Sequence, residues 1–84
     1  MNDALTVRQT QILKALIDEY IDTADAVGSE SLDKKYSLGV SPATIRNEMS
    51  TLTKVGYLRQ LHTSAGRVPT PKAMKFYVDQ LMEE

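Results

Sequence analysis

The chain has 84 residues and a mass of 9.4 kDa, which allows one small domain with a thin core. It contains no cysteine and one histidine, which excludes disulfides, thiolate metal sites and multi-histidine metal sites. No apolar stretch approaches the ~20 residues needed to cross a bilayer, and the N-terminus has no apolar signal segment. We therefore expect a cytoplasmic protein that is not an enzyme and that needs no cofactor or metal.

Charge is distributed unevenly along the chain, although the formal net charge is only −1. Residues 1–33 carry two basic and seven acidic side chains, whereas residues 34–78 carry eight basic side chains and one acidic one. A strongly basic segment in a chain whose total net charge is near zero indicates a polyanionic partner.

The first two helices are predicted from their caps and their apolar spacing. A helix over residues 7–22 begins after Thr6, and Gln9 completes a capping box. Its apolar face repeats at helical spacing and is formed by Ile12, Leu13, Leu16, Ile17, Tyr20 and Ile21. A short second helix is predicted over residues 29–36, with Ser29 as its cap.

The next segment predicts a helix-turn-helix. A glycine-containing turn over residues 37–40 leads to Ser41 and Pro42, which are a cap and a proline at the first helical position. The third helix is predicted over residues 42–55, with Ile45, Met49 and Leu52 on its apolar face, and ends before Gly56. Two helices joined by a short turn with glycine are typical of this motif.

The remaining residues predict a β-hairpin and a fourth helix. The hairpin, or wing, covers residues 57–70, and Pro69 confines its second strand to a sheet edge. The fourth helix covers residues 71–82 and begins with Thr70-Pro71, again a cap and a proline at the first helical position. Its apolar stripe consists of Met74, Tyr77, Val78 and Leu81. The sequence thus predicts a single domain over residues 1–84 that is mainly α with a small β-hairpin. Its fold is a winged helix-turn-helix with a three-helix core, a two-stranded wing and a C-terminal fourth helix.

The outward face of the third helix has the residue types that read DNA. With Ile45 at the centre of the buried face, the opposite side is small, polar and basic and consists of Ala43, Asn47, Ser50 and Lys54, flanked by Arg46. Asn suits a bidentate bond with adenine, and Arg suits guanine or a phosphate. Ser41 and Thr44 can bond phosphate oxygens near the helix N-terminus.

Other candidate contacts lie outside this helix. In the wing they are His62, Thr63, Ser64 and Arg67, with Arg67 presented from the tip to a narrow minor groove. Lys34 and Lys35 are candidates for contacts with the DNA backbone or for solvation of the second helix. Phe76 lies off the apolar stripe of the fourth helix, and it is predicted to be exposed for an interdomain or dimer contact.

Four segments carry a resemblance to a known family. They are Val40 to Met49, Gly56-Tyr57-Leu58, His62 to Thr70, and Phe76 to Asp79. These segments resemble the N-terminal DNA-binding domain of the HrcA family, the repressors of bacterial class I heat-shock operons. The resemblance implies a winged-helix repressor that binds an inverted-repeat operator as a dimer and releases it on heat stress. Members of the family are longer, so tight binding is expected to need additional domains or a second copy.

The residues and the resemblance together predict sequence-specific binding of double-stranded DNA in a bacterial or archaeal cytoplasm, associated with the nucleoid when bound. The alternative from another class is a winged helix that contacts other proteins without binding DNA. The outward face of the third helix is neither acidic at its centre nor apolar, which favours DNA. RNA binding is weaker as an interpretation, because no aromatic residues are arranged to stack single-stranded bases.

Overall fold

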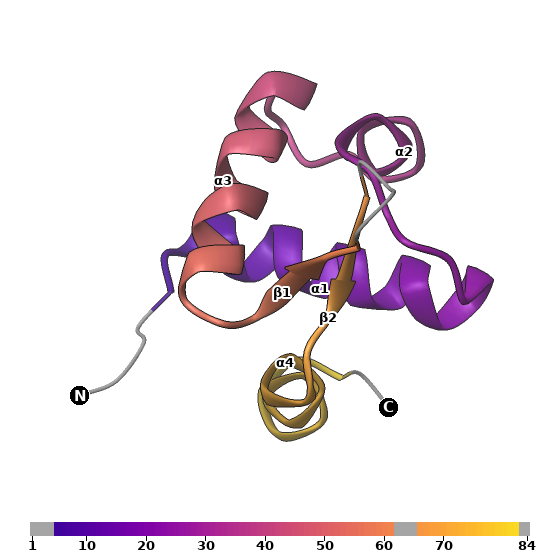
Figure 1. Ribbon diagram of the computed structural model, residues 1–84. Coiled ribbons are helices and arrows are strands. Elements are labelled where there is room, and N and C mark those ends of the chain that lie inside the picture. The colour runs from indigo at the N-terminus through magenta and orange to yellow at the C-terminus, as the bar shows by residue number, and fades with distance from the viewer. Residues whose placement is uncertain (1–4, 62–65, 83–84) are drawn as a thin grey trace.

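Four helices and a two-stranded hairpin make up the computed structural model, which describes residues 5–61 and 66–82. The elements in chain order are α1 (Val7–Thr23), α2 (Ser29–Lys35), α3 (Pro42–Lys54), β1 (Leu58–Gln60), β2 (Arg67–Pro69), α4 (Pro71–Phe76) and the π-helical turn η1 (Tyr77–Leu81). In Figure 1, α1 runs behind the hairpin, α2 and α3 lie on one side of it, and α4 lies at the opposite end. The predicted fold class, mainly helical with a hairpin after the third helix, is confirmed.

Local signals at the helix starts act as the sequence predicts in three of the helices. The cap side chains that accept a hydrogen bond from a backbone N–H of the first turn are Thr6, Ser41 and Thr70. The expected cap of α2 is wrong. Gly28 occupies the N-cap position without a side-chain bond, and Ser29 is already inside the helix and buried.

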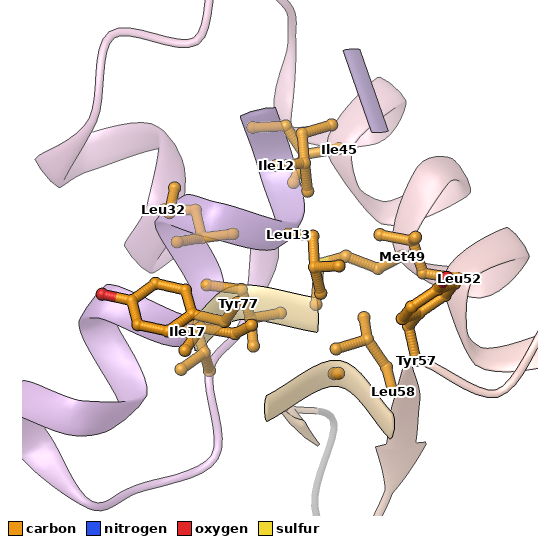
Figure 2. Close-up of a cluster of buried hydrophobic side chains, with 14 residues drawn as sticks. Ile12, Leu13, Ile17, Leu32, Ile45, Met49, Leu52, Tyr57, Leu58 and Tyr77 are labelled. Carbon is orange, nitrogen blue, oxygen red and sulfur yellow. The ribbon is translucent and has the colours of Figure 1, made fainter. Parts of the chain in front are cut away.

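The core forms where α1 crosses the other elements. Figure 2 shows side chains from α1, α2, α3, β1 and η1 meeting in one cluster. The helix α3 contributes Ile45, Met49 and Leu52, which are 0%, 3% and 0% exposed. Burying side chains of this size stabilises the fold by about 1.5–3 kcal/mol each, so α3 is held firmly by one face and leaves the other for solvent.

The last turn of α1 departs from the predicted apolar face. Ile21 is 56% exposed, while Glu19 is buried. The last turn of α1 extends beyond the hairpin (Figure 1), and the helix ends at Thr23, followed by the C-cap Ala24 with a left-handed φ of 61°. Lys35 of α2 donates a hydrogen bond to Glu19 at 2.9 Å and so compensates the buried carboxylate.

The C-terminal helix packs against the core with a different face from the one predicted. Ala73 is fully buried, and its small side chain makes this residue the centre of the contact. Val78, predicted to be buried, is therefore 56% exposed. Phe76, predicted to be exposed, is half-buried, and its ring centroid lies 5.5 Å from that of Tyr57. The expected single helix over 71–82 also changes at Tyr77 into a π-helical turn, in which the N–H of Met82 donates to the carbonyl of Tyr77 at 2.7 Å.

The hairpin is antiparallel, and it is tied to the connection between α1 and α2. Gln60 pairs with Arg67 across the two strands. On its other side Arg67 exchanges two backbone hydrogen bonds of 2.9 Å with Val27. The preceding Gly66 passes so close that a Cβ there would lie 3.0 Å from backbone atoms of Ala26 and Val27. The α1–α2 connection therefore fixes where β2 lies.

Candidate nucleic-acid interface

The exposed face of α3 contains most of the residues predicted to read DNA. Ala43, Arg46, Asn47 and Lys54 are exposed, whereas Thr44 and Ser50 are half-buried. Among the described residues neither Arg46 nor Lys54 has a carboxylate in ion-pair range. This face therefore presents an amide and two cations to solvent.

Hydroxyl groups organise the start of α3. Ser41 is exposed and accepts a hydrogen bond from the N–H of Thr44 at 3.2 Å. Its hydroxyl also donates to Thr44 Oγ1 at 3.2 Å. Pro42 occupies the first helical position, where no N–H is needed. The first turn of α3 is thus held by Ser41, and both hydroxyl groups lie at the positive end of the helix dipole.

The acidic residue of α3 is turned away from this face. Glu48 accepts a hydrogen bond from Gln9 Nε2 at 3.1 Å, and Arg8 Nη1 lies 3.5 Å from its other oxygen. The Glu48 side chain is only 19% exposed. Contact with α1 therefore both orients this carboxylate and balances its charge, so that the exposed face of α3 stays free of acid.

A hollow of about 570 Å³ lies between α2, α3 and the hairpin. Its lining includes two arginines and one carboxylate among polar and apolar surface. The lining residues are Gly28, Ser29, Glu30, Ser31, Arg46, Met49, Ser50, Gln60 and Arg67. Sequence reasoning missed Ser31, Glu30 and Gln60 as parts of this site. No local pattern brings them together, because the hollow depends on the bridge between Val27 and Arg67.

Arg67 lies in β2, so its predicted position at the hairpin tip is wrong. The side chain is half-buried, and Nε donates to Thr53 Oγ1 of α3 at 3.1 Å. Thr53 Oγ1 in turn donates to the carbonyl of Met49 at 2.8 Å. Arg67 therefore joins the hairpin to α3 and lines the hollow. The other predicted wing contacts, His62, Thr63 and Ser64, lie outside the described residues.

The two lysines of α2 differ in their surroundings. Lys35 donates its hydrogen bond to Glu19, and this bond and the carboxylate charge raise the pKa of Lys35 above its ordinary value of 10.5. Lys34 is exposed and pairs with no acidic side chain of the described segments. Burial raises the pKa of the neighbouring Tyr36. Of the two lysines, Lys34 is the one whose charge is available to a partner.

Comparison with known proteins decides the family. Residues 4–82 match the family described as "Winged helix-turn-helix transcription repressor, HrcA DNA-binding". The chain belongs to the HrcA family. It is 57% identical over 76 residues to the heat-inducible transcription repressor HrcA of Desulforudis audaxviator, covering 90% of this chain and 22% of that protein. The HrcA of Acetivibrio thermocellus is 55% identical over 80 residues, which are 95% of this chain and 23% of the relative.

A solved structure has the same fold. A crystal structure described as that of a hypothetical protein superimposes with a TM-score of 0.88 at 41% identity, over 90% of this chain and 24% of the other. The chain thus spans about a quarter of the length of the HrcA proteins and of the solved structure that it matches. It is a winged-helix DNA-binding domain of a non-enzymatic repressor family, which favours DNA over the alternative of protein contacts alone.

Within residues 5–61 and 66–82, no helix has both the length and the apolarity that a membrane crossing requires. The same residues contain no cluster of three or more His, Cys, Asp or Glu side chains that could hold a metal ion.

Proposed function

We propose that the chain reads double-stranded DNA by inserting α3 into the major groove, as the operator-binding part of a heat-responsive HrcA repressor. The observation that carries the proposal is the exposed face of α3, where Asn47 lies between small and basic side chains. An α-helix fits the major groove, and small residues such as Ala43 let it approach the base edges.

Each polar residue on this face has a role that its chemistry suggests. Asn47 can bond N6 and N7 of an adenine, and Arg46 can bond a guanine or a phosphate. Lys54 and Ser50 lie along the same helix, within reach of bases or backbone. Ser41 and Thr44 suit phosphate contacts at the start of the helix, where the dipole favours an anion.

The hollow beside α3 is proposed to receive the DNA backbone. Arg46 and Arg67 supply positive charge from two walls, and Gln60 and Ser31 are polar groups on the other elements that line it. Phosphate contacts of this kind fix the register of a protein on the duplex but carry no base sequence. Lys34 and the hairpin residues His62, Thr63 and Ser64 remain predicted backbone contacts.

A second copy is proposed to complete the operator complex. A single module buries about 600–1,000 Å² against DNA, and helix-turn-helix proteins usually gain specificity by placing two copies on half-sites about 34–36 Å apart. An inverted-repeat operator would match such a pair. The relatives are named heat-inducible repressors, and this supports heat as the signal that releases the operator. Phe76 packs on Tyr57 and is half-buried, and its role as an interdomain or dimer contact stays a prediction.

The test compares two amide-to-alanine variants of the 84-residue chain. Both are titrated against a duplex selected from a random-sequence library by the unmodified chain, and against a random-sequence duplex. Asn47→Ala should cost about 1–3 kcal/mol on the selected duplex and little on the random one. Gln80→Ala, an exposed amide on η1, is the matched control and should change neither. Equal losses on both duplexes would make Asn47 a backbone contact and contradict base reading.

A further inference from the structure

The first turn of α1 is joined to the middle of α3 by hydrogen bonds that pass through Gln9. Gln9 Oε1 accepts from the N–H of Thr6 at 3.0 Å, and Gln9 Nε2 donates to Glu48 Oε1 at 3.1 Å. Thr6 Oγ1 completes the capping box by accepting from the N–H of Gln9 at 3.0 Å. The Gln9 amide thus serves two partners at once, one in α1 and one in α3.

Only glutamine at position 9 can make both contacts, whereas the capping box alone could also be formed by glutamate. A capping box accepts Glu or Gln at its fourth residue, because either side chain offers an oxygen to the N–H of the cap. Only Gln can also donate to a carboxylate, because ionised Glu has no donor. A glutamate at position 9 would satisfy Thr6 equally well and would place a second carboxylate against Glu48.

The hydrogen bond between Gln9 and Glu48 lies where it can limit the rotation of α3 about its own axis. The apolar side chains of α3 hold the helix against the core, but apolar contacts are non-directional and define the rotation about the helix axis less sharply than a directional contact does. A hydrogen bond is directional, and Glu48 is the neighbour of Asn47 on the flank opposite to the hollow. A rotation of α3 would move Asn47 relative to the base edges that it is proposed to read.

We propose that Gln9 is a positioning residue for DNA recognition, which fixes the rotation of α3 through Glu48 and so aims Asn47 into the major groove. The inference rests on the proposed function of α3. Arg8 shares the same carboxylate at 3.5 Å and adds charge balance, but its side chain is 53% exposed and its contact is less directional. The capping box of α1 therefore serves the DNA-reading helix as well as its own.

The test exchanges donor and acceptor. Gln9→Glu keeps the capping box but opposes Glu48, and should lower the preference for the selected duplex over the random one about tenfold. The double variant Gln9→Glu/Glu48→Gln restores a donor–acceptor pair with the roles exchanged, and should return the preference to within about threefold of the unmodified chain. A residue that served only the stability of α1 would show neither the loss of preference nor this rescue.

Three outcomes decide the inference. An unchanged preference in Gln9→Glu overturns it, as does a double variant that stays as poor as the single one. If Gln9→Glu does not fold, the double variant decides alone, by keeping or losing the preference.

Asn47→Ala in the same titrations separates the two proposals. If Asn47→Ala loses the preference and Gln9→Glu does not, only the role of Gln9 fails; if Asn47→Ala keeps it, the proposed function fails.

Discussion

Replacing Gly66 with alanine should loosen the hairpin from the connection between α1 and α2. The added Cβ would lie 3.0 Å from Ala26 C, Ala26 Cβ and Val27 N, of which two are backbone atoms. Val27 cannot recede without lengthening its two 2.9 Å hydrogen bonds with Arg67. Overpacking of this kind costs about 1–3 kcal/mol, and the reduced entropy of the unfolded chain returns about 0.4–1 kcal/mol. The expected net loss is about 1–2 kcal/mol.

Urea denaturation followed by circular dichroism measures this loss. With a slope of about 1 kcal/mol per molar for a small domain, the midpoint should fall by roughly 1–2 M. Gly28→Ala is the matched control, because a Cβ at Gly28 meets nothing within 4 Å. Its midpoint should change by much less. A Gly66→Ala variant as stable as the unmodified chain would refute the reasoning that the close approach at Ala26 and Val27 fixes β2.

Two further substitutions test other parts of the fold. Ala24→Gly should raise the free energy of unfolding by about 0.5–1 kcal/mol in urea, because Ala24 has a φ of 61° that glycine adopts without strain; a less stable variant would contradict this. Tyr77→Phe should lower it by about 1–2 kcal/mol, because the Tyr77 hydroxyl donates to Asp18 of α1. Tyr57→Phe is the control for Tyr77→Phe, because the Tyr57 hydroxyl bonds no other side chain in the described segments. Equal losses of stability in the two variants would show that the bond to Asp18 does not stabilise the fold.

The order of elements could be predicted from the sequence because its signals are local. The capping box at Thr6 and the pairs Ser41-Pro42 and Thr70-Pro71 each lie within a few residues of the helix they start. The inward face of α3 also follows from spacing alone, and its three predicted core residues are buried. The exposed face with Asn47 was accessible by the same reasoning.

What could not be predicted depends on partners far apart in the chain. Gln9 meets Glu48 across 39 positions, and Arg67 meets Thr53 across 14. Neither pairing leaves a periodic trace in the sequence. The rotation of α4 is a second kind of failure, because Ala73 looks unremarkable in an apolar pattern. Because Ala73 is small, it can lie at the centre of the contact with the core, which leaves Phe76 half-buried and Val78 exposed.

The central claim, that α3 reads base edges in the major groove, is tested most directly by altering the DNA. Replacing single purines of the selected duplex with their 7-deaza analogues removes the N7 acceptor from the major groove and leaves the minor groove unchanged. We predict about tenfold weaker binding at one or more positions, with the effect at an adenine absent in Asn47→Ala. Full tolerance of every 7-deaza purine, together with weaker binding when inosine removes the N2 amino group of guanine from the minor groove, would contradict the account.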